Sequence, residues 1–482
     1  MQPRQTLMNQ TTPSDERTLA RFGYRQELKR TLGYFSSFAV SFSIISVTTG
    51  LFANYGDGLR IAGPAFIWTW LIVGGGQFLV ALVFSRLAAA IPLSGYAYNW
   101  TRHLAGPNLA WWAGWMMIVQ FLTGMPGVCY ALASYLVPYL GLSSSSRNVV
   151  LVTVAVLVSI ALINHFGIRL ASLVNNVSVG AEILGTVLIG LLLLVVALAR
   201  HTNPASFLFT HPAQSGGFAY VGAFAFSSLM SAWTLTGFEG AANVAEETRT
   251  PGEHVPRAII VSEVSSVVLG FVVLVGFTLA IPSLAAVSGH PAPLLLIISH
   301  YFPPLMTHAT MLLVFISIFA CALANLTTLT RMVWAMARDG QLPTSPWLAR
   351  VSAHQVPANA IWTVTLVSVL FVLWARVEAV ITGVATLAGF VTYAIVVGAT
   401  LGRQRAGPRA TGTDSGEPAG QGPLLQLPRA MSWAALAWIL VLLAMLSLPR
   451  QAWVNSLATL GAVGVGGAWY LVVRRKRSGR VS

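Results

Sequence analysis

Charged residues are scarce in this chain. Only 9% of its 482 residues are Asp, Glu, Lys or Arg, whereas soluble domains average roughly 25%. Hydrophobic residues make up 55% of the chain, and the mean hydropathy is +0.71. This composition excludes an ordinary soluble enzyme or signalling domain and predicts an integral membrane protein.

Cysteines and catalytic motifs are also few. The two cysteines, Cys129 and Cys321, both fall inside long apolar stretches, so a disulfide framework is not indicated. The sequence has no P-loop, nucleotide-binding glycine pattern, HExxH motif or paired CxxC motif, and its nine histidines are scattered. We therefore predict that the protein is not an enzyme and has no cofactor and no metal site.

Long apolar stretches dominate the sequence instead. A membrane-spanning helix needs about 20 apolar residues. Twelve stretches qualify: Leu32–Ala53, Pro64–Ile91, Leu109–Leu140, Val149–Phe166, Val177–Ala199, Phe218–Val244, Ala258–Val287, Ala309–Thr330, Ala360–Trp374, Ala379–Leu401, Met431–Leu448 and Ala452–Val473. The ninth is short, and we expect it to begin near Ala358. The sequence thus predicts an all-α membrane protein with 12 transmembrane helices.

Basic residues are distributed unevenly between these stretches. With a cytoplasmic N-terminus and single crossings, only five of the 28 Lys and Arg residues lie outside: Arg60, Arg147, Arg200, Arg376 and Arg450. The net charge of +14 therefore sets orientation and does not indicate nucleic acid binding. The first 31 residues are polar, so we expect no cleavable signal peptide. We expect a multi-pass protein of the plasma or inner membrane, with both termini cytoplasmic.

The chain divides into six predicted segments. They are a cytoplasmic tail (1–31), a first five-helix repeat (32–200), a second five-helix repeat (218–401), a flexible cytoplasmic linker (402–430), two accessory helices (431–473) and a basic tail (474–482). The repeat assignment depends on the first and sixth stretches, which share a polar segment that contains glycine. Halves of five spans have opposite topology, which is the inverted-repeat plan of many secondary transporters.

The two polar segments are Ser43–Gly50 (SIISVTTG) and Ser231–Glu239 (SAWTLTGFE). Irregular backbone at membrane depth is tolerated only inside the protein or along a wet cavity. We therefore predict a helix break in each, with Gly237 and Glu239 supporting the second and Trp233 and Phe238 flanking it to cover a substrate. Ordinary helix packing is the alternative, because glycine, serine and tryptophan are common in membrane bundles.

Three of the 14 acidic residues lie inside apolar stretches: Glu182, Glu239 and Glu263. A carboxylate is costly at this depth, so such residues are functional candidates. Glu182 is the candidate for proton coupling, because no Lys or Arg lies at similar depth. The alternative for each is a packing hydrogen bond to Ser, Thr or backbone, and Glu263 fits that alternative best because it lies near the inner end of its span.

Four segments resemble one family. They are Gly23–Leu51 (GYRQELKRTLGYFSSFAVSFSIISVTTGL), Ile91–Pro107 (IPLSGYAYNWTRHLAGP), Gly237–Ile259 (GFEGAANVAEETRTPGEHVPRAI) and Arg331–Pro343 (RMVWAMARDGQLP). Together they resemble the amino acid–polyamine–organocation permeases. The resemblance is strongest to the amino acid/choline branch, which includes fungal GABA permeases and plant bidirectional amino acid transporters.

The resemblance implies a leucine-transporter-type 5+5 inverted repeat with broken helices 1 and 6, plus two terminal helices. It also implies a substrate site between the breaks. The substrate carboxylate would meet free backbone N–H groups at the first break, and the ammonium group would meet carbonyls and side chains at the sixth. The implied substrate-binding residues are Ser46, Thr48, Thr49, Gly50, Ala232, Trp233, Thr236, Gly237 and Phe238.

Two positions depart from relatives. Thr48-Thr49-Gly50 stands where well-studied relatives have a glycine-serine-glycine turn, and Glu182 lies near the position of a Lys in some proton-coupled relatives. We therefore expect a secondary transporter for amino acids or GABA-like amines that works by alternating access. A proton is the expected coupling ion, in symport or in exchange (antiport), and the alternative is a cation that the Glu182 carboxylate attracts. The near alternative is a choline or polyamine permease, and the distant one is a channel or receptor.

Overall fold

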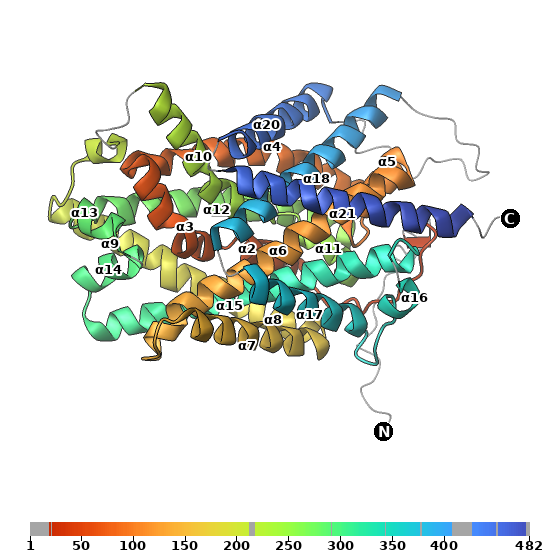
Figure 1. Ribbon diagram of the computed structural model, residues 1–482, viewed down its shortest axis with the longest axis horizontal. Coiled ribbons are helices and arrows are strands. Elements are labelled where there is room, and N and C mark those ends of the chain that lie inside the picture. The colour runs from red at the N-terminus through yellow and green to blue at the C-terminus, as the bar shows by residue number, and fades with distance from the viewer. Residues whose placement is uncertain are drawn as a thin grey trace.

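The computed structural model describes residues 19–20, 22–211, 217–290, 292–342, 344–375, 378–406, 427–449 and 452–478. Over these residues the regular secondary structure is helical, and the extended backbone pairs only in an isolated bridge between Leu32 and Thr248. Most of the long helices run roughly along the long axis of the molecule (Figure 1). The prediction of an all-α protein is confirmed for the part of the chain that the structure describes.

The helices follow one another in a simple order. The N-terminal half contains α2 (Tyr34–Ile45), α3 (Val47–Ala62), a 3-10 turn (Pro64–Ile67), α4 (Trp68–Ala90), α5 (Tyr96–Ala105), α6 (Pro107–Tyr139), α7 (Ser146–His165), α8 (Ile168–Glu182), a π-helical turn (Ile183–Val187) and α9 (Leu188–Ala199). The C-terminal half contains a 3-10 turn (Ala205–Phe209), α10 (Phe218–Thr234), α11 (Gly240–Asn243), a 3-10 turn (Ala245–Glu247), α12 (Pro251–Leu279), α13 (Leu284–Ser288), α14 (Pro293–Tyr301), α15 (Pro304–Arg338), α16 (Ser345–Leu348), α17 (Ala358–Ala375), α18 (Glu378–Ala406), α20 (Arg429–Ser447) and α21 (Trp453–Ser478).

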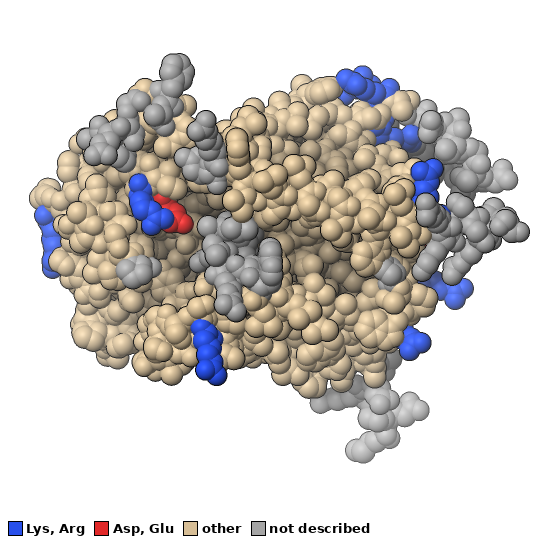
Figure 2. Space-filling view, viewed as in Figure 1, with Lys and Arg blue, Asp and Glu red and all other residues tan. Residues whose placement is uncertain are grey.

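Within the described residues, ten helical stretches are long and apolar enough to cross a membrane: Tyr34–Ala62, Pro64–Ala90, Pro107–Tyr139, Ser146–His165, Arg169–Ala199, Pro251–Leu279, Pro304–Arg338, Thr382–Ala406, Arg429–Ser447 and Trp453–Arg474. Figure 2 shows a surface that is almost free of charge between its ends, with most visible Lys and Arg at one end. The ninth predicted span forms the shorter apolar helix Ala358–Leu373, and α17 begins at Ala358 as expected. The sixth predicted span is interrupted after Thr234.

Several observed helices extend beyond the predicted stretches, as α8 and α15 do, and two of these differences change the interpretation. The seventh helix begins at Pro251 rather than Ala258, so Glu263 is its thirteenth residue and lies more than three turns inside it. The linker prediction for 402–430 also fails at its start, because α18 continues to Ala406. Residues 407–426 of that linker lie outside the described residues, as do 1–18 of the N-terminal tail and 479–482 of the C-terminal tail.

The described part of the N-terminal tail is docked on the bundle. Gln26 donates to the carbonyl of Glu246 at 2.8 Å, and Arg30 donates to the carbonyl of Thr248 at 2.9 Å. The backbone N–H of Leu32 donates to the carbonyl of Glu247 at 3.0 Å. The segment before the first span therefore pairs with the segment that follows the sixth.

The packing places both predicted breaks in the interior. Helix α6 packs along α18 and α15, and α2 packs against α12 and α8. The labels of α2, α6 and α11 lie near the middle of the bundle in Figure 1. Polar groups at the ends of α2 and α10 are thus shielded from lipid by other helices, as irregular backbone at this depth requires.

Candidate functional site

The first span is interrupted at Ser46. Helix α2 ends at Ile45 and α3 begins at Val47, and Ser46 between them has φ 29° and ψ 89°. A positive φ is uncommon for a residue other than glycine. The Ser46 hydroxyl accepts hydrogen bonds from the N–H of Thr49 at 3.2 Å and from its hydroxyl at 2.8 Å, and so caps α3.

The sixth span is interrupted over five residues. Helix α10 ends at Thr234 and α11 begins at Gly240. Gly237 has φ 103°, a conformation that side chains rarely permit. The Gln77 amide of α4 donates to the carbonyl of Leu235 at 2.9 Å, so part of the freed backbone is satisfied by a neighbouring helix.

The two breaks fit into one another. A Cβ atom on Gly237 would overlap the side chain of Ile44, and a Cβ atom on Gly50 would overlap the side chain of Thr234. The Ser41 hydroxyl donates to the carbonyl of Phe238 and accepts from the N–H of Ala241, both at 2.8 Å. Each break therefore needs its glycine, because the other break packs directly against it.

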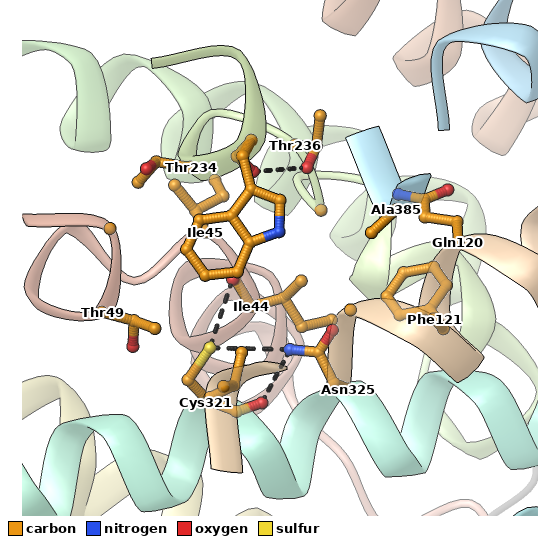
Figure 3. A pocket seen from close by; sticks show the side chains of 15 residues that line it. Ile44, Ile45, Thr49, Gln120, Phe121, Thr234, Thr236, Cys321, Asn325 and Ala385 are labelled. Atoms are coloured by element: carbon orange, nitrogen blue, oxygen red, sulfur yellow. Dashed lines mark hydrogen bonds between the residues drawn. The ribbon is translucent and has the colours of Figure 1, made fainter. Parts of the chain in front are cut away.

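A cavity of about 30 Å³ lies between the breaks, enough for about two water molecules. Its wall is formed by Ile44, Ile45, Thr49, Gly50, Gln120, Phe121, Gly124, Val128, Trp233, Thr234, Thr236, Gly237, Cys321, Asn325 and Ala385. In Figure 3, Gln120 and Asn325 lie on the side opposite Thr49 and Thr234. The cavity is contracted, so a larger guest requires its wall to move.

Five of the predicted substrate-binding residues line this cavity: Thr49, Gly50, Trp233, Thr236 and Gly237. Thr236 donates its hydroxyl to the carbonyl of Trp233 at 2.7 Å. The structure thus brings residues from both breaks to one cavity.

The other four predicted residues do not line it. Ser46 is used in the cap of α3, and Ala232 is buried in α10. Phe238 does not face the cavity, because its ring packs against those of Phe84 and Tyr393 at centroid distances of 5.9 and 5.6 Å.

Thr48 points toward the fifth span. Its hydroxyl lies 2.6 Å from that of Thr186, in the π-helical turn. Neighbouring residues of a helix differ by about 100° in direction, so Thr49 faces the cavity while Thr48 faces away from it.

The prediction of free N–H groups at the first break is also wrong in this structure. The N–H of Thr48 donates to Glu182 at 3.0 Å, that of Thr49 to the Ser46 hydroxyl, and that of Gly50 to the Ser46 carbonyl at 3.1 Å. The chain itself supplies these acceptors because unpaired buried N–H groups are costly.

Glu182 is buried beside the first break. Besides the Thr48 N–H, its carboxylate accepts the hydroxyl of Ser317 on α15 at 3.3 Å. It lies directly before the π-helical turn, an irregularity that is frequent at functional sites. Glu182 therefore connects the fifth span to both the first break and the eighth span.

Glu239 is buried at the sixth break and has three donors. The hydroxyls of Tyr393 and Tyr96 donate to it at 2.7 and 3.1 Å, and the N–H of Gly237 at 3.2 Å. These partners come from α18, from α5 and from the break itself. Glu239 thus ties the unwound segment to two other helices.

Several cavity residues were not predicted from the sequence, notably Gln120, Cys321 and Asn325. The Asn325 amide donates to the carbonyl of Cys321 at 2.8 Å, and the thiol of Cys321 donates to the carbonyl of Ile44 at 3.5 Å. A polar Gln or Asn in an otherwise apolar span was the available signal.

Buried ion pairs near the docked N-terminal segment were missed as well. Glu247 binds Arg331 through both oxygens at 2.9 and 3.2 Å, and both side chains are 0% exposed. Glu246 binds Arg338 through both oxygens at 3.1 and 3.2 Å. We call these four residues the ion-pair cluster. Both glutamates fall in a predicted loop, and hydropathy does not show that a loop is buried.

A second contact joins the same end of the molecule. Arg102 on α5 forms an ion pair with Asp339, which also accepts the hydroxyls of Tyr98 at 2.8 Å and Tyr24 at 3.0 Å. Burial and the nearby Asp339 carboxylate raise the pKa of Tyr24 to about 12 and hold the pKa of Tyr98 well above its usual value. Both phenols therefore stay protonated donors at neutral pH.

The sequence is similar to known proteins over most of its length. Residues 32–466 match the profile of the family described as Amino acid permease. The chain is 30% identical over 467 residues to amino-acid permease BAT1 of Arabidopsis thaliana, with 89% of this chain and 88% of that protein covered. It is 29% identical to the BAT1 homolog of Oryza sativa, with 94% and 92% covered. It is 28% identical to amino-acid permease 2 of Neurospora crassa, with 84% and 78% covered.

Proposed function

The chain belongs to the amino acid permease family, and we propose that its two interlocked helix breaks form the substrate site of an alternating-access carrier. The protein is a multi-pass membrane transporter for amino acids and not an enzyme. The observation that supports this location for the site is the cavity that the breaks share.

The proposed architecture has 12 spans. Residues 32–200 and 218–401 form two inverted five-helix repeats, and α20 and α21 are accessory. The interruption at equivalent places of the first and sixth spans supports this plan. We place the protein in the plasma or inner membrane with both termini cytoplasmic, because Lys and Arg concentrate on that side.

The substrate carboxylate is proposed to bind at the first turn of α3. Thr49 and Gly50 face the cavity there, and a helix N-terminus favours negative charge. Since the N–H of Thr49 is held by the Ser46 hydroxyl at 3.2 Å, the carboxylate would replace that internal acceptor. The substrate ammonium group would meet the opposite wall, at the Trp233 carbonyl and Thr236.

This arrangement predicts a requirement for the carboxylate. In uptake of a radiolabelled substrate by proteoliposomes, unlabelled amino acids and GABA are expected to inhibit at least about tenfold more effectively than putrescine or choline, because a lost charge-assisted hydrogen bond costs about 1.5–3 kcal/mol. Equal inhibition by GABA and putrescine would contradict the carboxylate site and favour a polyamine carrier. Protein-free liposomes give the background.

Glu182 is proposed to carry the coupling proton. It is 1% exposed, and its carboxylate contacts the first break through Thr48 and the eighth span through Ser317. Protonation would remove its charge from the N-terminus of α3 and so change the attraction between these spans.

Replacement of Glu182 by glutamine tests this role. Glu182→Gln cannot release a proton, so it is expected to lose accumulation driven by an imposed pH gradient while it retains exchange of internal for external substrate. Glu253→Gln, at an exposed position near the start of α12, is the matched control and should behave as wild type. If wild-type protein ignores the gradient, or Glu182→Gln responds to it normally, Glu182 is not the coupling residue.

A further inference from the structure

Among the described residues, Glu263 is the one buried glutamate whose carboxylate has no hydrogen-bond partner. It is 0% exposed on α12, and both of its oxygens are unpaired. Glu182 and Glu239, by contrast, each accept from two or more donors. A buried carboxylate without donors or a cation carries a large desolvation penalty, and the usual escape is to take up a proton.

The packing of α4 against α12 shows what faces Glu263. The Trp70 indole donates to the carbonyl of Val267 at 2.9 Å, and Gly74 lies against the Val267 side chain. Gly270 lies against the Trp70 ring. These contacts make the two helices antiparallel neighbours, so Gln77, one turn beyond Gly74, is level with Glu263.

Gln77 supplies an acceptor, its side-chain oxygen, on the α4 side of Glu263. Its amide nitrogen is committed to the carbonyl of Leu235 in the sixth break, and its Oε1 atom is buried and unpaired. An ionised Glu263 would place its carboxylate oxygens beside the Gln77 Oε1 atom, which is also an acceptor. A protonated Glu263 instead offers its O–H as a donor to that atom.

The neighbouring carboxylate of Glu239 also favours a protonated Glu263. Glu239 holds the same unwound segment that Gln77 holds: Gln77 donates to the carbonyl of Leu235, and Glu239 accepts the N–H of Gly237 two residues later. Helix α11, which begins directly after Glu239, packs against α12. Because Glu239 has three donors and Glu263 has none, a single negative charge is better stabilised on Glu239. Two neighbouring carboxyl groups in such a site share one proton and titrate as a pair.

Other charged groups near α12 are paired or distant. On the elements packed against it, Tyr34 lies under Arg257, and Glu246 and Glu247 are bound by Arg338 and Arg331. Arg86 is nine residues beyond Gln77 on α4 and is exposed.

Helix α3 also packs against α12, and its ionisable groups are paired. Asp57 forms an ion pair with Arg60, and Tyr55 forms a hydrogen bond with Thr278. Thr278 lies about four turns along α12 from Glu263. No charge on these elements, over the described ranges, compensates an ionised Glu263.

We propose that Glu263 and Glu239 form a proton-binding pair behind the sixth-span break, with the proton held on Glu263 while Glu239 is bound by Tyr96 and Tyr393. This site is separate from Glu182. Loss of the proton would place two adjacent charges behind the break and displace the segment that Gln77 and Glu239 hold. The role of this pair in gating rests on the proposed transport function, whereas the location of the proton does not.

The first test needs no substrate. Infrared spectra of the purified full-length protein at neutral pH are expected to contain the band of a protonated, buried carboxylic acid. The measurement is made in a Glu182→Gln background, because Glu182 is the other buried carboxyl group proposed to carry a proton. There, Glu263→Gln should abolish the band, whereas Glu253→Gln should retain it. Absence of the band in Glu182→Gln alone, its persistence after Glu263→Gln is added, or its loss after Glu253→Gln is added would overturn the assignment. A band that disappears when sodium is added would also overturn it and point to a bound cation.

The second test measures exchange in proteoliposomes with the same pH on both sides. Wild-type exchange should fall at alkaline pH as the pair loses its proton, and Glu263→Gln, which cannot acquire the second charge, should keep its activity there. An identical alkaline decline in both proteins would contradict the role in gating. Absence of exchange in wild type at any pH would instead refute the proposed function, while the infrared result would still stand.

Discussion

Gly237→Leu is expected to abolish uptake. The residue has φ 103°, and a side chain there would overlap Ile44 of the first break. Backbone strain of this kind costs roughly 1–3 kcal/mol before the steric overlap is added. Because a change of about 1.4 kcal/mol is tenfold in a rate, we expect uptake to fall at least tenfold at equal surface expression.

A glycine elsewhere on the same span provides the control. A Cβ atom on Gly222 of α10 would have no neighbouring atom within 4 Å, so Gly222→Leu should leave uptake near the wild-type level. Glu239→Ala, which removes the acceptor for Tyr96 and Tyr393, should reduce uptake as Gly237→Leu does. Near-normal uptake in both Gly237→Leu and Glu239→Ala would show that the break is not needed for transport.

Arg331→Met is expected to open the end of the protein that the proposed orientation places at the cytoplasm, here called the inner end. It leaves Glu247 buried and unpaired, and breaking a buried ion pair costs roughly 3–5 kcal/mol. The cluster joins the segment after the sixth span to the eighth span, so the closed inner state should lose most of its population. We expect uptake to fall at least about tenfold, because 1.4 kcal/mol already corresponds to that factor.

Cys321 reports the opening directly, because it lines the cavity. In a Cys129→Ala background, Arg331→Met should make Cys321 react faster with a thiol reagent applied from the inner side. The exposed pair of Arg60 and Asp57 is the control, since surface pairs contribute about 0–1 kcal/mol. Unchanged labelling in Arg331→Met, or faster labelling in Arg60→Met, would contradict this role of the cluster.

The two helix breaks could be predicted from the sequence for a local reason. A polar segment with glycine inside an apolar stretch cannot face lipid, so Ser43–Gly50 and Ser231–Glu239 had to lie within the bundle. The same reasoning identified Glu182 and Glu239 as buried carboxylates, and the structure buries both. Neither inference required knowledge of which helix packs against which.

The directions of individual side chains depend on helix rotation and packing, which hydropathy does not record. Thr48 and Thr49 are neighbours of similar chemistry, yet one faces the fifth span and the other faces the cavity. Phe238 turns away from the cavity because the positive φ of Gly237 redirects the chain into an aromatic cluster. Such choices are fixed by contacts between segments distant in sequence.

The sequence by itself therefore determined the membrane class, the apolar spans and the two breaks, because each follows from the cost of placing polar groups in lipid. Only the tertiary structure decided which side chains face the buried charged and polar groups. It paired Glu247 with Arg331 across 84 positions, and its packing of α4 on α12 brought Gln77 level with Glu263. A charge can be assigned to a span from local composition, but its neutralising partner is chosen by how the helices pack.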